Sequence, residues 1–342
     1  MTNDYSYDFN NKVLLITGGT GSFGKRFVKN ILKDFPNIKK IIIFSRDELK
    51  QLEMKNMYPR LEFPQLRFFI GDVRNAERLN LACRDVNVII HAAALKQVDT
   101  AEYNPTECIA TNVKGAENVI NAALSNKVER VVALSTDKAC SPANLYGATK
   151  LVSDKLFIAA NNIRGSLPTK FSAVRYGNVM CSRGSVIPFF KELSLKSEVV
   201  PITDLEMTRF NISLDEGVDL VIKALSKMIG GEIFVPKIPS YSIKTVLAAI
   251  APNSDYKVIG IRPGEKLHEE MVSSTEALTT LDCNEYFVIL PSVSYNISFE
   301  DYKNHHSGNL LPKGSCYRSD TNRHWETVET LRKRAMAELE NN

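Results

Sequence analysis

The chain has 342 residues, of which 44% are hydrophobic and 24% charged, and its formal net charge is +4. These values are typical of a globular protein in solution, and the small positive excess argues against a nucleic-acid partner. No apolar run reaches the roughly 18 residues of a membrane helix, and residues 1–11 lack the apolar core of a signal peptide. We therefore expect a cytoplasmic protein with no membrane partner.

The first half of the chain alternates short apolar segments with amphipathic ones. Near-continuous apolar strands between helices indicate a parallel sheet covered on both faces, so the fold class is α/β with a doubly wound parallel sheet of the Rossmann type. The expected strands are 12–17, 40–45, 66–70, 86–90 and 130–134, with additions near 171–174 and 232–235. The expected helices are a first one ending near 35, then 47–57, 75–83, 105–125 and 144–163.

Beyond residue 177 the pattern becomes less regular, with many prolines and helices expected near 186–196, 214–228 and 243–250. The segment 292–322 is either a long ordered loop or an arm that grips a neighbouring subunit, and 326–340 predicts a charged terminal helix. The predicted division is a Rossmann domain of 11–177 plus 211–235, a smaller substrate region of 178–210 plus 236–291, and a C-terminal arm and helix of 292–342.

The six cysteines are scattered without C-x-x-C spacing. This arrangement predicts reduced thiols, with neither a disulfide framework nor a zinc site. We expect no metal ion in the protein.

A glycine-rich turn follows the first predicted strand and opens the first helix. Gly18, Gly21 and Gly24 are spaced G-x-x-G-x-x-G, and missing side chains let backbone N–H groups and the helix N-terminus approach a pyrophosphate. The turn therefore predicts a dinucleotide site, to which Thr20, Ser22 and Phe23 also belong.

The end of the second strand selects between NAD and NADP. An acid there binds the ribose 2′-hydroxyl, whereas an arginine accommodates a 2′-phosphate. Ser45, Arg46 and Lys50 favour NADP, and Asp47 is the residue that would favour NAD. We also expect Asp72, Val73, Ala92, Ala93, Ala94 and Lys96 to lie along the cofactor, because they follow the third and fourth strands, and we expect His91 to be structural.

Tyr146 and Lys150 are four residues apart, so on a helix they share one face, about 6 Å apart at Cβ. A neighbouring cation is expected to lower the tyrosine pKa toward working pH, so that the phenol exchanges a proton with a sugar hydroxyl while hydride moves to a nicotinamide. Just upstream, Asp137 and Lys138 add a carboxylate and a second amine.

These motifs together resemble the extended short-chain dehydrogenase/reductase superfamily: T-G-G-T-G-S-F-G at 17–24, H-A-A-A at 91–94, S-T-D at 135–137 and Y-G-A-T-K at 146–150. Longer segments are similar to its inverting UDP-N-acetylglucosamine 4,6-dehydratases: S-T-D-K-A at 135–139, R-Y-G-N-V at 175–179, M-T-R-F at 207–210 and R-P-G-E-K-L-H-E-E at 262–270. The similarity is strong over about 12–290.

The resemblance implies a lyase that oxidises UDP-N-acetylglucosamine at C4, removes water across C5 and C6, and returns hydride to C6. NADP would be tightly held and recycled in each turnover. The resemblance implies catalytic roles for Asp137, Lys138 and Tyr146, with Thr136 near C4 and Lys150 on the nicotinamide ribose. Burial beside Lys150 is expected to lower the pKa of Lys138. Substrate contacts are expected from Lys96, Asn178, Arg183, Arg209, Arg262 and Glu265.

Two other functions remain open. A UDP-sugar 4-epimerase would return hydride to C4 and needs no elimination pair, whereas a non-catalytic NADP sensor needs neither Tyr146 nor Lys150. The resemblance also implies a closed homo-oligomer, with a hexamer as the expected form. The pathway that consumes the product, such as pseudaminic acid or capsule synthesis, and the division of C4 and C5 proton transfer between Lys138 and Tyr146, remain open.

Overall fold

A computed structural model describes residues 7–182 and 184–340 of the chain. Its centre is a ten-stranded sheet in the order β16-β14-β15-β10-β6-β5-β4-β1-β2-β3, which is parallel from β3 to β10 and antiparallel beyond β10. The parallel strands are β1 (Val13–Thr17), β2 (Lys40–Ser45), β3 (Leu66–Ile70), β4 (Val88–His91), β5 (Arg130–Leu134), β6 (Lys170–Val174) and β10 (Ile233–Pro236). The antiparallel strands are β14 (Thr280–Asp282), β15 (Tyr286–Ile289) and β16 (Asn309–Leu310).

The predicted α/β class is confirmed, and the apolar runs form the parallel strands. Every residue of β1 is buried, as the continuous run of branched apolar side chains requires in a sheet covered on both faces. The prediction for β4 was wrong by two residues. Asp85 has a left-handed φ of 59°, and Val86 N–H donates to the Cys83 carbonyl, so the chain is still turning where the strand was expected to begin.

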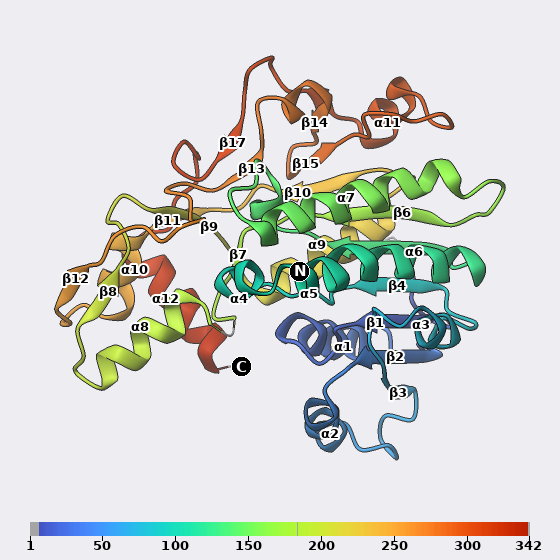
Figure 1. The fold of residues 1–342 in the computed structure, drawn as a ribbon, viewed down its shortest axis with the longest axis horizontal. Helices are drawn as coiled ribbons and strands as arrows, with labels where there is room; N and C mark the ends of the chain where they lie inside the picture. Colours follow the sequence, from blue (N-terminus) through green and yellow to red (C-terminus); the bar gives the residue numbers. More distant parts are fainter. Residues whose placement is uncertain (1–6, 183, 341–342) are drawn as a thin grey trace.

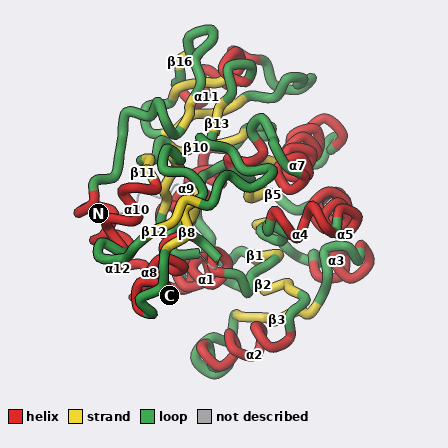
Figure 2. The backbone as a smooth tube through the Cα atoms, turned by 60° about the vertical axis from the view of Figure 1, so that its left-hand side comes forward, coloured by secondary structure: helices red, strands yellow, loops and turns green. Residues whose placement is uncertain are grey.

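Helices cover both faces of the sheet. Helices α3, α6 and α7 pack in a row on one side, whereas α1 packs against α9 on the other (Figures 1 and 2). The helices of this part of the chain, including α2, are α1 (Ser22–Asp34), α2 (Glu48–Met57), α3 (Ala76–Ala82), α6 (Gly115–Ser125), α7 (Leu145–Ile163) and α9 (Leu214–Lys227).

The single helix predicted over 105–125 is three segments: α5 (Pro105–Ile109), a π-helical turn η1 (Ala110–Lys114) and α6. In this turn the Asn112 side chain bonds both the backbone N–H and the carbonyl of Leu95, at 2.8 and 2.9 Å. The wide turn therefore ties the helix to the chain that follows β4. The short helix α4 (Val98–Tyr103) in that chain was not predicted.

A smaller lobe with its own apolar core lies beyond one end of the sheet strands (Figure 1). It contains a three-stranded sheet in the order β11-β9-β7 and a two-stranded sheet of β8 and β12. Its members are β7 (Asn178–Val179), α8 (Val186–Leu195), β8 (Val200–Ile202), β9 (Thr208–Ile212), β11 (Ser240–Ser242), α10 (Ile243–Ile250), β12 (Tyr256–Val258) and the terminal helix α12 (Val328–Glu340).

The segment 292–322 folds onto its own chain. It carries α11 (Phe299–His306), the sheet strand β16, and β17 (Tyr317–Arg318), which pairs with β13 (Glu270–Val272). A short 3₁₀ turn, η3 (Glu276–Thr279), precedes β14. Thus the part of the chain predicted as an arm supplies strands to two sheets of the same subunit, and the predicted three-part division stays a prediction.

Between residues 7 and 340, with residue 183 excepted, no helix combines the length and apolarity needed to cross a membrane.

Candidate active site

A cavity of about 620 Å³ lies where the parallel strands end. The residues that follow β1, β2, β3, β4 and β5 all line it, because the carboxyl ends of parallel strands meet at one edge of the sheet. The predicted cofactor residues come together on its walls: Gly18, Thr20, Gly21, Ser22, Phe23, Gly24, Ser45, Arg46, Lys50, Asp72, Val73, Ala92, Ala93, Ala94, Lys96, Tyr146 and Lys150.

The turn after β1 is shaped for an anion. Gly18 has a φ of +66°, and a Cβ there would lie 2.9 Å from the Ala93 backbone. A Cβ on Gly24 would collide with the Gly19 backbone. Helix α1 begins after Gly21 with no side-chain cap and no acid in its first turn, so its N-terminal N–H groups face the cavity without an internal acceptor. This donor set fits the pyrophosphate of a dinucleotide.

The side chains at the end of β2 differ in what they are free to bind. The Asp47 carboxylate caps α2 by accepting from Lys50 N–H at 3.0 Å, and it also pairs with Lys50 Nζ at 3.0 Å. Ser45 is held by Gln51 Nε2 at 3.1 Å. Arg46 lines the cavity half-exposed, 3.5 Å from Asp72. Arg46 and Asp47 therefore both line the cavity, but the acid is engaged as the cap of its own helix.

His91 lies at the end of β4 and is not among the residues that line the cavity. Its Nδ1 is 2.8 Å from the Thr17 hydroxyl, and burial lowers its pKa to about 3. It is a neutral hydrogen-bonded histidine inside the sheet, as expected.

Asp137 and Lys138 lie on a 3₁₀ turn, η2 (Asp137–Ala139), directly after β5. Lys138 Nζ is 3.1 Å from Asp137 Oδ1, which also accepts from the Thr136 hydroxyl at 2.9 Å. The Asp137 side chain is buried, whereas the Lys138 side chain is 26% exposed and lines the cavity. The amine therefore has access to a substrate, with the carboxylate beneath it.

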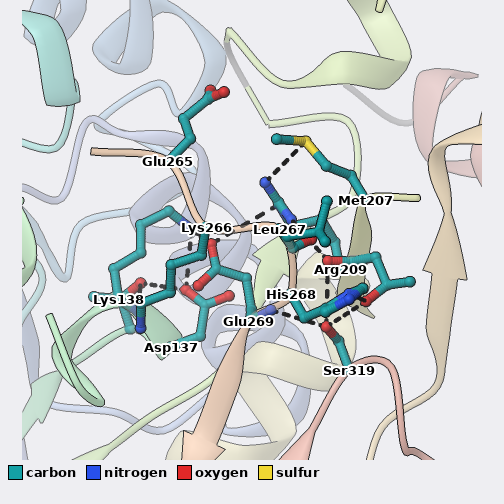
Figure 3. Close-up of polar contacts among 12 residues, drawn as sticks. Asp137, Lys138, Met207, Arg209, Glu265, Lys266, Leu267, His268, Glu269 and Ser319 are labelled. Carbon is teal, nitrogen blue, oxygen red and sulfur yellow. Dashed lines mark hydrogen bonds and ion pairs between the residues drawn. The ribbon is translucent and has the colours of Figure 1, made fainter. Parts of the chain in front are cut away.

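A second carboxylate approaches Lys138 from the loop that precedes β13. Glu269 Oε1 lies 3.1 Å from Lys138 Nζ and 3.8 Å from Arg209 Nε (Figure 3). Sequence reasoning missed Glu269, although it lies in the R-P-G-E-K-L-H-E-E segment. No local pattern in that segment indicates that this acid, and not Glu265 or Glu270, meets the amine.

The expected fall in the pKa of Lys138 is wrong for this structure. Burial alone would lower the pKa, but the carboxylates of Asp137 and Glu269 raise it overall. Burial raises the pKa of Asp137, and the negative Glu269 adds to that rise, while Lys138 opposes it. The ammonium is thus the favoured form of Lys138, and Asp137 is a carboxyl that takes a proton readily.

The expected fall in the pKa of Tyr146 is also wrong. Tyr146 and Lys150 both lie on α7 and line the cavity, but burial raises the pKa of Tyr146 to about 12. The largest contribution that opposes this rise is the Lys138 ammonium. Lys150 is itself buried, which lowers its pKa, with Asp154 opposing. The cation nearest in sequence is therefore not the one that acts most on the phenol.

The predicted substrate residues are not all gathered at the cavity. Asn178, on β7, and Lys96 line it, and burial lowers the pKa of Lys96. Arg209 is turned inward: its Nη1 donates to the carbonyls of Thr208 and Leu267, at 2.8 and 3.0 Å. Arg183 lies outside the described residues.

Arg262 and Glu265 pair with each other at 2.8 Å on the loop that precedes β13. Figure 3 shows Glu265 directed away from the Lys138 cluster. The loop is held to the start of α7, where Asn144 Nδ2 donates to the Gly264 carbonyl at 2.8 Å. Both residues are therefore near the start of α7 and outside the cavity wall, and their predicted roles stay predictions.

The family model described as "Polysaccharide biosynthesis protein" matches residues 14–291, which is most of the chain. The chain belongs to this family. It is 53% identical over 328 residues to a Campylobacter jejuni protein named "UDP-N-acetylglucosamine 4,6-dehydratase (inverting)", covering 94% of this chain and 97% of the relative. It is also 46% identical over 303 residues to a protein of Rickettsia bellii named "UDP-glucose 4-epimerase", covering 86% of this chain and 87% of the relative.

Among solved structures, the family fold is matched by "Pen from Bacillus thuringiensis". The TM-score is 0.86 at 35% identity, over 97% of this chain and 100% of that one. The predicted Rossmann-type α/β fold is therefore shared with this structure over nearly the whole chain.

Proposed function

We propose that this protein is a UDP-N-acetylglucosamine 4,6-dehydratase that inverts the configuration at C5. The observation that carries the proposal is the Asp137–Lys138 pair beside Tyr146 at the dinucleotide cavity, because water loss needs an acid and a base that a simple hydride exchange does not need. The 53% identity to the Campylobacter dehydratase supports the same substrate.

The cofactor that fits the cavity is a nicotinamide dinucleotide, and we propose NADP. The glycine turn and the free N-terminus of α1 would hold the pyrophosphate, with Thr20, Ser22 and Phe23 alongside. Arg46 would hold the 2′-phosphate because Asp47 is engaged as the cap of α2. When bound, the nicotinamide would supply the hydride chemistry, as the acceptor for oxidation at C4 and the donor for reduction at C6.

The side chains of the pair would carry the elimination. A ketone at C4 acidifies the C5 proton, and the amine of Lys138, once neutral, takes that proton. The Asp137 carboxyl donates a proton to the 6-hydroxyl, the C6–O bond breaks, and water leaves. Inversion at C5 requires removal of the proton from one face of the ring and reprotonation from the opposite face, and Lys138 and Tyr146 are the candidates for these two proton-carrying groups.

The remaining predicted residues would bind and orient. Thr136 would contact the sugar near C4, and Lys150 would hold the nicotinamide ribose. Asn178 and Lys96 line the cavity and would contact the substrate. Arg183, Arg209, Arg262 and Glu265 stay candidates for the nucleotide half, and a closed homo-oligomer in the cytoplasm stays the expected form.

The deciding experiment is turnover of UDP-N-acetylglucosamine in deuterated water, followed by NMR of the product. We expect a 6-deoxy-4-keto sugar with deuterium at C5 and the L configuration. A product with the D configuration contradicts the inverting assignment. Conversion to UDP-N-acetylgalactosamine favours the epimerase, which the Rickettsia relative's name makes the second candidate. A retained cofactor without any change in the sugar favours a sensor.

A further inference from the structure

Lys138 is shared between two buried carboxylates. Its Nζ is 3.1 Å from Asp137 Oδ1 and 3.1 Å from Glu269 Oε1, and the exposed fractions of the two acids are 1% and 3%. One ammonium cannot neutralise two carboxylates, so the three groups together carry one excess negative charge when both acids are ionised. Among the described residues, Asp137 Oδ2 and Glu269 Oε2 have no hydrogen-bond partner.

Arg209 supplies the balancing positive charge, and it pairs with Glu269 and not with Asp137. Its Nε lies 3.8 Å from Glu269 Oε1, and Lys266 also acts on this carboxylate. Burial would raise the pKa of Glu269, yet Lys138 and Arg209 lower it overall. The pKa of Asp137 is raised. Glu269 is thus the acid that stays ionised, and Asp137 is the acid that accepts a proton.

The backbone fixes Glu269 in this position. Its N–H donates to the Ser319 hydroxyl at 2.9 Å, and its carbonyl accepts from Ser319 N–H at 2.8 Å. Ser319 follows β17 and also lies 2.7 Å from the Thr208 hydroxyl. The carboxylate therefore has a preset place behind Lys138. Glu269 is absent from the residues that line the cavity, so it acts on the substrate only through the amine.

Resting on the function proposed above, we propose that Glu269 is a positioning residue whose fixed negative charge holds protons on both groups of the pair, the Lys138 amine and the Asp137 carboxyl. Glu269 Oε1 attracts the Lys138 ammonium directly at 3.1 Å and repels a negative charge on Asp137 across it. The Glu269–Arg209 ion pair keeps the Glu269 carboxylate ionised. Both the base and the acid of the elimination therefore release their protons only at a higher pH than they would without Glu269.

The groups that face Lys138 come from every element packed around it. They are Asp137 on η2, Glu269 before β13, Arg209 on β9, Tyr146 on α7 and Tyr241 on β11. Glu269 is the one carboxylate among them that lies apart from the cavity wall. Its charge can therefore be removed without removing a wall residue of the cavity.

The test is Glu269→Gln, read first by competitive acetylation of the holoprotein with acetic anhydride across a pH series and mass spectrometry of the Lys138 peptide. Loss of the negative charge favours the neutral amine, so we expect Lys138 to become reactive at a pH lower by about one unit or more. The same change should move both limbs of the pH profile of kcat to lower pH. Without the negative charge of Glu269, Lys138 and Asp137 both lose their protons more easily. Glu269→Asp retains the charge and should give a smaller shift in the same direction.

The control is Glu206→Gln, which removes an exposed carboxylate that pairs with Lys244 on the surface. We expect no shift there. An unchanged Lys138 labelling profile in Glu269→Gln overturns the inference, and if that variant fails to fold, an unchanged profile in Glu269→Ala, which removes the same charge, does so. The labelling result stands apart from the proposed reaction: a shifted profile in a protein that dehydrates no UDP-sugar supports the role of Glu269 and refutes the proposed function.

Discussion

Asp137 Oδ1 lies 3.1 Å from Lys138 Nζ, so two adjacent residues on one 3₁₀ turn form an ion pair beside the cavity. Adjacent side chains on a helix diverge, but the tight turn after β5 directs these two toward each other. The Lys138 side chain is partly exposed, whereas the Asp137 side chain is buried. This pair is the feature that the proposed dehydration depends on.

Lys138→Ala should abolish dehydration while the cofactor stays bound. The variant removes the proposed base at C5, and loss of a general base typically costs 10² to 10⁴ in rate, so we expect kcat to fall by at least about a hundredfold. Product formation by NMR and the absorbance of copurified cofactor measure the two properties. Lys244→Ala, at an exposed ion pair, is the control, and ordinary turnover in Lys138→Ala would remove this amine from the mechanism.

Arg46→Ala should weaken NADP binding and leave NAD binding nearly unchanged. A lost hydrogen bond to a charged group costs roughly 1.5–3 kcal/mol, or about 10- to 150-fold in Kd. Titration of the cofactor-depleted protein with each dinucleotide measures the effect, with exposed Arg60→Ala as the control. An equal loss for both cofactors would show that Arg46 does not read the 2′-phosphate.

Gly24→Ala should destabilise the protein and prevent cofactor binding. The added Cβ would strike the Gly19 backbone, which is part of the phosphate turn, and such overpacking costs about 1–3 kcal/mol. Gly217→Ala is a matched control in α9, where nothing apart from the helix's own neighbouring backbone lies within 4 Å of the new Cβ. There we expect a gain of about 0.5–1 kcal/mol from helix propensity. Chemical denaturation of both variants measures the free energy of unfolding, which should fall in Gly24→Ala and rise in Gly217→Ala.

Glu232→Gln should loosen the attachment of α11. The buried Glu232 carboxylate accepts from the Ser172 hydroxyl at 2.6 Å and from Gly230 N–H at 2.8 Å, and it lies 3.4 Å from His306 Nε2. Loss of its charge should cost about 2–3 kcal/mol at neutral pH. Urea unfolding measures this cost, and Glu285→Gln, at a largely exposed acid, should change stability by less than about 0.5 kcal/mol.

The cost of Glu232→Gln should also depend on pH. Burial would raise the pKa of Glu232, but hydrogen bonds from His306 and Ser172 lower it overall below 4.5. A carboxyl whose folded pKa is depressed stabilises the protein fully above its unfolded pKa, and this contribution is lost as pH falls through the folded pKa. The difference between wild type and variant should therefore be constant from pH 7 to about 5 and should shrink below about pH 4. A difference that grows on acidification contradicts this assignment.

The parallel half of the fold was predictable because its signals are local. Each buried strand is one apolar run, and the glycine turn, the end of β2 and the Tyr146–Lys150 spacing are read within a few residues. The C-terminal segment was not predictable in the same way, since β16 and β17 have two residues each and form only through pairing with distant strands. Their short polar sequences carry no periodicity.

Many residues that line the cavity were predictable, but Glu269 and the charge states of the titratable groups were not. Spacing placed Tyr146 near a cation, yet burial raises its pKa and Lys138 opposes that rise most. The pKa of Lys138 depends on Glu269, which tertiary folding brings to it from far along the chain. A sequence pattern indicates which groups share an element, but it does not indicate how deeply each is buried.

The contact between Ser319 and Glu269 sets an order of events during synthesis. Ser319 follows Glu269 by 50 residues, and until it has left the ribosome the strand pairing that seats Glu269 behind Lys138 cannot be made. A nascent chain can already hold its dinucleotide turn and its Tyr146 helix while the amine still lacks its second carboxylate. Chemical competence would then arrive only once Ser319 has emerged, after the cofactor site has formed.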